Sequence, residues 1–263
     1  MTGWERRPWD SAFFGVAIAQ IAAGRTTAGE LAAAVAQAND ASVECLCFLA
    51  DADDQESVRA AEVNGFSLMD VRLTLECAVD ATSSALARRS REAKAALARR
   101  SREAKAAIRP AAPGDLPPLV ALARTSHRNT RFHRDVRFDP ARSDDLYAVW
   151  VERSVKGELA DAVWVVDVDE APSGYITASR GPAGASIGLV AVDEAYRGRG
   201  YGDQLLRTVL DWAAAQGIPR VSVVTQGRSA PAVRFYERAG FATSLIQLWY
   251  HRWLTGAMGL GQE

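Results

Sequence analysis

The stretch AYRGRGYG, residues 195–202, decides how this sequence folds, because it joins an apolar run to a strongly amphipathic one. The apolar run, SIGLVAV at residues 186–192, predicts a buried strand. Residues 202–216 predict a helix with one apolar face, formed by Leu205, Leu206, Val209, Leu210 and Ala213. A glycine-rich loop between a strand and a helix N-terminus is typical of a phosphate-binding site.

Three other interpretations of this stretch fail on its own residues. A dinucleotide fingerprint that starts at Gly198 would need a third glycine where Asp203 stands. A Walker loop needs Gly-Lys-Ser/Thr, and the stretch has no lysine. A nucleic-acid segment rich in arginine and glycine would carry many copies, whereas this one occurs once. A phosphate-wrapping loop and a tight structural turn with incidental arginines both stay open at this point.

The neighbouring residues resemble those of the GCN5-related N-acetyltransferases, the GNAT family. RGRGYG (197–202) resembles the family's Arg/Gln-x-x-Gly-x-Gly/Ala loop, which binds the pyrophosphate of acetyl-CoA. IGLVAV (187–192) resembles its splayed central strand, VSVVT (221–225) the next strand, and SAPAVRFYERAGF (229–241) the segment that follows. The resemblance implies an α/β protein of GNAT fold, with a mixed, mostly antiparallel central sheet flanked by helices, and acetyl-CoA as the co-substrate.

The resemblance also implies which residues act on acetyl-CoA. Tyr236 is the candidate general acid, since a phenol with a pKa of about 10 can protonate the departing thiolate. The alternative is that Tyr236 only packs, as Phe235 beside it can. Where many relatives have asparagine, Ser229 stands at the start of the tyrosine helix and can cap it. Acetyl-CoA contacts are predicted at Leu189, Val190, Ala191, Val192, Arg197, Gly198, Arg199, Gly200, Tyr201, Gly202 and Ser229.

A narrower resemblance covers almost the whole chain and concerns the acceptor. The stretches 9–21, 64–76, 130–139 and 225–254 resemble acetyltransferases that act on dTDP-linked 4-amino-4,6-dideoxyhexoses. This implies a nucleotide-linked amino sugar as the acceptor. The alternatives are another small amine, a peptide amine, or a non-catalytic acyl-CoA-binding regulatory module. A sugar-linked diphosphate needs positive charge, and a basic loop offers Arg128, Arg131, Arg134 and Arg137, although a merely solvated loop has the same composition.

The sequence does not fix a general base for the acceptor amine. Glu194, Glu152, His133 and Asp135 are candidates, but each also suits a surface or positioning role. A water-mediated route, or an amine of low pKa, needs no such residue. The three histidines have no metal-ligand spacing, so we expect no metal.

The chain divides into three predicted parts. Residues 1–80 alternate helix and strand signals and predict a smaller N-terminal α/β subdomain, and residues 108–263 predict the acetyltransferase domain. Between them, residues 81–107 contain ALARRSREAKA twice in succession. An 11-residue period is close to three helical turns, so the repeat predicts one long helix with Leu86, Leu97 and Ile108 on one side. A solvated connector and a nucleic-acid-binding arm both fit its eight basic and two acidic residues.

Composition narrows the class of protein further. The 263 residues include 31 basic and 32 acidic ones, and the formal net charge of −1 gives no overall attraction to nucleic acid or to an anionic membrane. No segment approaches the ~18 uninterrupted apolar residues that would span a bilayer. Cys45, Cys47 and Cys77 fit neither a disulfide framework nor a zinc site, so we expect reduced core residues in a cytoplasmic protein. The tryptophan-rich residues 249–253 suggest a homodimer contact.

Overall fold

The computed structural model describes residues 3–22, 24–79 and 106–254, and these form one ten-stranded sheet. In chain order the strands are β1 (Trp4–Arg6), β2 (Ile18–Ile21), β3 (Cys45–Asp51), β4 (Ser67–Ala78), β5 (Ala106–Pro110), β6 (Ala162–Val168), β7 (Ala171–Gly181), β8 (Gly184–Val192), β9 (Arg220–Gln226) and β10 (Ala242–Trp253). Their order across the sheet is β1-β2-β3-β10-β4-β9-β8-β7-β6-β5. Neighbouring strands are antiparallel except for β2 with β3 and β8 with β9.

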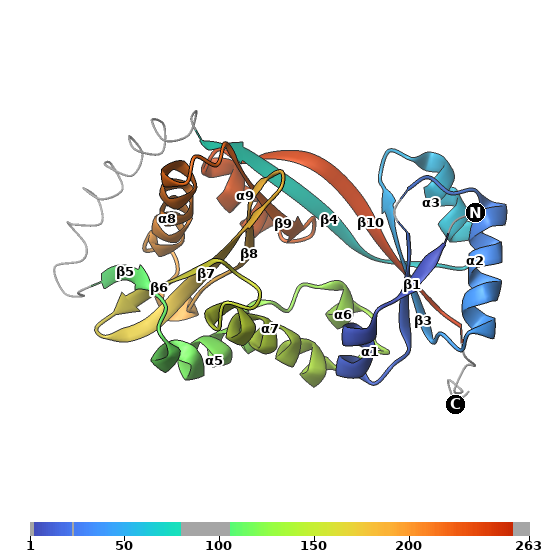
Figure 1. Ribbon diagram of the computed structural model, residues 1–263, viewed down its shortest axis with the longest axis horizontal. Coiled ribbons are helices and arrows are strands. Elements are labelled where there is room, and N and C mark those ends of the chain that lie inside the picture. Colours follow the sequence, from blue (N-terminus) through green and yellow to red (C-terminus); the bar gives the residue numbers. More distant parts are fainter. Residues whose placement is uncertain (1–2, 23, 80–105, 255–263) are drawn as a thin grey trace.

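Helices cover both faces of this sheet (Figure 1). One face carries α2 (Ala28–Asp40), α3 (Gln55–Val63), α8 (Tyr201–Ala215) and α9 (Ala230–Arg238). The other face carries α1 (Pro8–Phe14), α5 (Leu116–Ser126), α6 (Arg131–Arg134) and α7 (Pro140–Val155). Two 3₁₀ turns, η1 (Pro113–Asp115) and η2 (Glu194–Tyr196), precede α5 and α8. Side chains that alternate along each strand fill the two layers, as the period of two requires.

The local sequence explains where the functional helices begin. Helix α8 starts directly after its N-cap residue Gly200, whose φ of +82° is in the left-handed region that glycine adopts without strain. Its residues Leu205, Leu206 and Val209 are fully buried against the sheet, as the apolar periodicity predicts. Helix α7 starts at Pro140 after Asp139, whose carboxylate accepts a hydrogen bond from the Ala141 amide at 2.8 Å.

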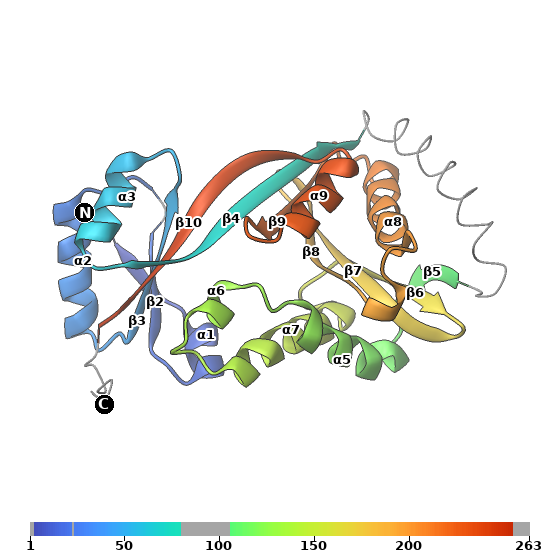
Figure 2. The ribbon, with the colours of Figure 1, turned by 180° about the vertical axis from the view of Figure 1, so that it is seen from behind.

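Strand β4 joins the N-terminal third of the chain to the rest. It lies between β9 and β10, paired with both, although all other strands from the first 79 residues lie on the far side of β10. Figures 1 and 2 show β4 and β10 running side by side along the molecule and linking its two ends. The division into parts at residues 80 and 108 stays a prediction, and the two flanking parts share one sheet.

The prediction for the duplicated segment falls almost entirely outside the described residues. Its last residues are described, and they are extended: Ala106 and Ala107 open β5. Ile108, predicted to lie on the face of a helix, pairs instead with Val166 of β6. The helix prediction is therefore wrong at Ile108, because pairing with a β-rich neighbour outweighs the helical period of the repeat.

Within the described ranges, no helix is both long and apolar enough to cross a bilayer. Cys45, Cys47 and Cys77 are free thiols, each buried in the structure.

Candidate active site

The parallel strands β8 and β9 pair at their beginning and then separate. Their pairing runs from Ala185 with Val221 to Ile187 with Val223. Beyond that point β8 stays paired with β7 as far as Val192, and β9 stays paired with β4 as far as Gln226. The two strands thus leave a gap between their carboxyl-terminal halves, and backbone groups along that gap have no strand partner there.

Alternate amides of β8 face the gap. The Leu189 amide donates to Thr177 Oγ1 at 2.9 Å and the Asp193 amide donates to the Ser173 carbonyl at 2.8 Å, both toward β7. Since successive amides of a strand point to opposite sides, those of Val190 and Val192 point toward β9. Of the four residues predicted to contact acetyl-CoA along this strand, only these two present amides to the gap.

The loop after β8 curls back onto the end of that strand. Gly198 and Gly200 have φ of +74° and +82°, and a Cβ on either would meet no atom within 4 Å. The Arg197 guanidinium donates from Nε to the Val192 carbonyl at 3.0 Å, and that of Arg199 lies 5.3 Å from the Tyr196 ring centre. The loop therefore places arginine side chains and the first amides of α8, which have no intrahelical acceptor, at the open end of the gap.

Two residues predicted to contact acetyl-CoA are also packing residues. Tyr201 is 3% exposed and belongs to the core between the sheet and α8. A Cβ on Gly202 would lie 3.2 Å from the Phe235 ring of α9, so glycine here lets the two helices approach closely. The sequence pattern of three spaced glycines combines two requirements: backbone conformation at Gly198 and Gly200, and close packing at Gly202.

Tyr236 lies on α9 in the same buried cluster as Tyr201, and the partly buried Val190 and Val192 pack against that cluster. Its ring packs against Phe235 and Phe241, and among the described residues no hydrogen bond to its hydroxyl is formed. Burial raises the pKa of this phenol above its ordinary value, which keeps it protonated at neutral pH. A protonated phenol without a protein partner is suited to donate to a bound ligand.

Ser229 occupies the N-cap position of α9, but its hydroxyl makes no capping hydrogen bond. Its amide donates to the Gln226 carbonyl at 2.9 Å, which holds the loop close to the end of β9. The side chain is half-buried, and the role of Ser229 in binding acetyl-CoA stays a prediction.

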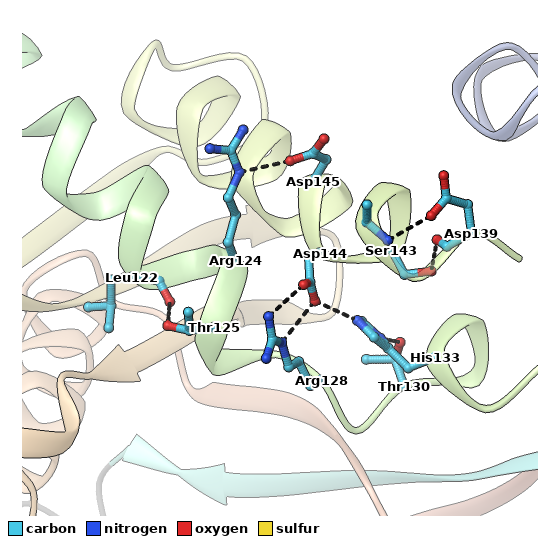
Figure 3. Close-up of polar contacts among 11 residues, drawn as sticks. Leu122, Arg124, Thr125, Arg128, Thr130, His133, Asp139, Ser143, Asp144 and Asp145 are labelled. Atoms are coloured by element: carbon cyan, nitrogen blue, oxygen red, sulfur yellow. Dashed lines mark hydrogen bonds and ion pairs between the residues drawn. The ribbon is translucent and has the colours of Figure 1, made fainter.

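The basic loop after α5 is largely engaged within the chain. Arg128 forms a bidentate pair with Asp144, at 2.7 and 3.0 Å, and His133 Nε2 contacts the same carboxylate at 3.0 Å (Figure 3). The Arg131 guanidinium lies 4.0 Å from the centre of the Trp249 ring, and that of Arg137 lies 5.4 Å from the Trp253 ring. Arg134 is exposed. Arg134 is thus the member of this predicted set that extends into solvent with no ring or carboxylate contact among the described residues.

A buried polar network fixes α6 to the end of the sheet. Asp135 Oδ2 accepts from Trp253 Nε1 at 2.9 Å and lies 2.8 Å from His251 Nδ1. Burial alone would raise the pKa of Asp135, but the hydrogen bonds from His251 and Trp253 hold it below its usual range. Trp249 and Trp253 also pack in the core of their own chain, so the homodimer contact predicted from them stays untested.

The four acidic or basic side chains predicted as possible general bases have other partners or positions. His133 contacts Asp144 and Thr130, Asp135 is held in the network above, and Glu152 pairs with Lys156 at 2.6 Å. Glu194 is exposed in η2. None of the four is a buried carboxylate with a free oxygen at the gap.

The structure reveals one carboxylate that sequence reasoning missed, Asp70 of β4. It is 4% exposed and pairs across the sheet with Trp249. The sequence contains one sign of it, an acidic residue in the middle of a strand that alternates apolar and polar residues, and acidic residues are rarely buried unless they have a partner. Nothing local, however, says which face of the strand is covered.

A cavity of about 450 Å³ lies between α1, the end of α7 and the bend of β8. Its lining includes Trp9, Trp150, Ser154, Thr177, Gly188 and Leu189. It touches β8 where the strand begins to leave β9, which places a second hollow next to the gap. Among the described residues, no cluster of histidine, cysteine or carboxylate side chains could hold a metal ion.

Comparison with known proteins agrees with this geometry. A family model described as the acetyltransferase (GNAT) family matches residues 126–241. The segment of residues 126–241 thus has the sequence of a GNAT acetyltransferase domain. The predicted family and the predicted fold class are confirmed.

Two curated relatives and one solved structure illustrate the similarity of this GNAT protein. It is 30% identical over 140 residues to dTDP-fucosamine acetyltransferase of Escherichia coli O6:H1, covering 52% of this chain and 59% of that protein. It is 25% identical over 144 residues to the spore coat polysaccharide biosynthesis protein SpsD of Bacillus subtilis strain 168, covering 55% and 50%. The match thus spans between half and three fifths of the length of these two relatives.

The similar solved structure is a GCN5-related N-acetyltransferase from Sphaerobacter thermophilus, with a TM-score of 0.55. The identity is 15%, and the match covers 82% of this chain and 62% of that one. At this identity the likeness concerns the fold alone, and it extends beyond the segment that the family model matches.

Proposed function

We propose that this GNAT protein transfers the acetyl group of acetyl-CoA to an amino group of a small molecule, most specifically a nucleotide-linked amino sugar of the dTDP-4-amino-4,6-dideoxyhexose type. The observation that carries the proposal is the gap between β8 and β9, with the glycine-arginine loop after β8 and with Tyr236 in the buried cluster against which Val190 and Val192 pack. We infer a cytoplasmic location, in which the three buried thiols stay reduced.

The residues along the gap fit acetyl-CoA in chemical kind. The amides of Val190 and Val192 can bond an extended chain of amides as an additional strand would. The loop of residues 197–202 offers backbone donors at a helix N-terminus together with two guanidinium groups, which suits a pyrophosphate. Tyr236 would then protonate the thiolate that leaves when the acetyl group is transferred.

The choice of acceptor rests on the relatives. The names of two similar proteins refer to dTDP-fucosamine and to the synthesis of a polysaccharide. The exposed Arg134, together with Arg228 after β9, supplies positive charge that a diphosphate would need.

The test is release of free CoA thiol from acetyl-CoA, followed with dTDP-linked 4-amino sugars, free amino sugars, polyamines and peptides. We expect turnover with the nucleotide-linked amino sugar at the highest kcat/KM of the panel. Equal kcat/KM for the free amino sugar would overturn the nucleotide-sugar acceptor. No thiol release with any amine, from protein that binds acetyl-CoA, would favour a non-catalytic binding module instead.

A further inference from the structure

Asp70 lies where the N-terminal third of the chain meets the gap. On β4 it comes two residues before Arg72, which pairs with Gln226, the last residue of β9. The Gly227 amide donates to the Val71 carbonyl at 2.7 Å, so the loop of Gly227, Arg228 and Ser229 lies against Asp70's neighbour. That loop leads directly into α9, the helix that carries Tyr236.

The Asp70 side chain faces α6. It is paired directly with Trp249, and directly paired residues of antiparallel strands extend to the same face of the sheet. Trp249 packs in the core under α5, α6 and α7, and Arg131 of α6 stacks on its ring. Asp70 therefore lies between the end of the β8–β9 gap and the loop proposed to hold the acceptor.

One oxygen of this carboxylate is uncommitted. Oδ1 accepts from the Val71 amide at 2.9 Å, and the described residues provide no donor to Oδ2. Among those residues, Ser126 Oγ and Asp167 Oδ1 are the side-chain polar atoms that are both sealed from solvent and unbonded. Within the described ranges Asp70 Oδ2 is also unbonded, but it is not one of these sealed atoms. Solvent therefore reaches this oxygen, although the residue as a whole is only 4% exposed.

The surroundings of Asp70 are partly desolvated and cationic. Burial raises its pKa to about 6, against the opposing influence of the Val71 amide and of Arg228, Arg134 and Arg131. The charge of Asp70 in turn contributes to raising the pKa of the buried Tyr147 of α7. Arg72 follows on the same face of β4. A carboxylate that is ionised at neutral pH yet basic enough to accept a proton is suited to general base catalysis.

We propose that Asp70 is the general base of the acetyl transfer and that Arg134 of α6 and Arg228 of the loop after β9 receive an anionic group of the acceptor, such as a phosphate. The inference rests on the proposed function. It adds to that function the residue that the amine contacts and the charge that the acceptor must carry.

The proton balance of the step is as follows. Asp70 Oδ2 takes one proton from the acceptor ammonium, which leaves a neutral amine whose lone pair attacks the thioester carbonyl. Asp70 later releases this proton to solvent. The new C–N bond forms, the C–S bond breaks, and Tyr236 gives its proton to the departing sulfur. The second proton lost by the nitrogen, passed directly or through water, restores the Tyr236 hydroxyl. One ammonium and one thioester thus become one amide, one thiol and one proton.

The test compares Asp70→Asn with the wild type and with Glu76→Gln, which removes a carboxylate from the same strand at its far end, where it pairs with Arg220. We expect Asp70→Asn to lower kcat/KM for the acceptor about 100-fold, the lower end of the usual range for general acid–base catalysis, with an unchanged Kd for acetyl-CoA. The wild type should lose activity as pH falls below about 6 with the pKa of Asp70, and the variant should instead follow the pKa of the amine. Glu76→Gln should match the wild type.

The outcomes separate this inference from the proposed function. A wild type that releases no thiol with any amine defeats the proposed function before Asp70 is tested. An active wild type with an Asp70→Asn variant within threefold of its kcat/KM from pH 6 to 9 overturns the role of Asp70. The anionic subsite has its own measurement: Arg134→Gln combined with Arg228→Gln should raise KM at least tenfold for a phosphate-bearing acceptor and leave that for its dephosphorylated form unchanged. An equal change for both acceptors would overturn the subsite.

Discussion

Replacing Asp70 by Asn should stabilise the protein above pH 7. Folding moves the pKa of Asp70 from about 3.9 in the unfolded chain to about 6, so the folded state holds this proton more tightly. A raised folded pKa means that the contribution of Asp70 to stability is fully present below about pH 4 and is lost as pH rises through 6. The shift of about two pKa units corresponds to roughly 3 kcal/mol, an upper bound for the cost of the ionised carboxylate at pH 8.

The asparagine removes that cost and keeps the bond from the Val71 amide, because its side-chain oxygen still accepts. Denaturant unfolding of both proteins at pH 4, 5, 6, 7 and 8 measures the effect. The difference in the free energy of unfolding should be near zero at pH 4 and grow to about 2–3 kcal/mol in favour of the variant at pH 8. In a thermal scan this corresponds to a rise in Tm of roughly 5–10 °C.

Glu76→Gln is the matched control. Its carboxylate pairs with Arg220 at 3.1 Å on the surface, and an exposed pair of this kind contributes less than about 1 kcal/mol. A variant at Asp70 that is no more stable than the wild type at pH 8, or whose advantage does not change with pH, would refute the reasoning. A gain in stability that accompanies the loss of activity would instead identify a residue kept at a cost to the fold.

Three further changes test other parts of the site. Tyr236→Phe should lower kcat about 100-fold and leave the Kd for acetyl-CoA within twofold, as measured by thiol release and calorimetry, since only the hydroxyl is lost; unchanged turnover would assign the ring to packing alone. Gly200→Val forces a β-branched residue into a φ of +82° and should raise KM for acetyl-CoA at least tenfold, whereas Gly217→Val, equally strained at φ +67° beyond the other end of α8, should cost similar stability without that effect. Equal KM values for the two variants would contradict a role for the loop in binding. Asp135→Asn should lower the free energy of unfolding at pH 7 by about 3 kcal/mol, because it breaks the buried contact with His251. A loss below about 1 kcal/mol in urea unfolding would show that this network does not stabilise the position of α6.

The loop and the strands beside it could be predicted because their signals are local. Glycine spacing at Gly198 and Gly200 reports backbone conformation, and the apolar period of α8 reports its buried face. The local pattern predicts that all three glycines contact acetyl-CoA. It does not show that close packing requires Gly202, because the Phe235 ring against it belongs to a different helix.

Asp70 could not be predicted as a site residue for a related reason. Its importance depends on β4 lying between β9 and β10, and this placement joins residues 70, 227 and 249. The order of strands in a sheet is set by packing between distant segments and is not encoded in the alternation of any one of them. The arginines after α5 illustrate the same limit, since their composition suggested a free basic surface while Arg128 is paired with Asp144.

The position of β4 also has a consequence for how the protein is assembled. A polypeptide of residues 106–254 alone would leave β9 and β10 with unpaired edges on either side of an empty strand position, which invites intermolecular pairing. The central sheet cannot close until β10, at the end of the described chain, has been synthesised and has met both β3 and β4. Folding is therefore dominated by long-range contacts and should be slow, and two separately produced fragments, residues 1–79 and 106–263, should regain a common fold only when they are mixed.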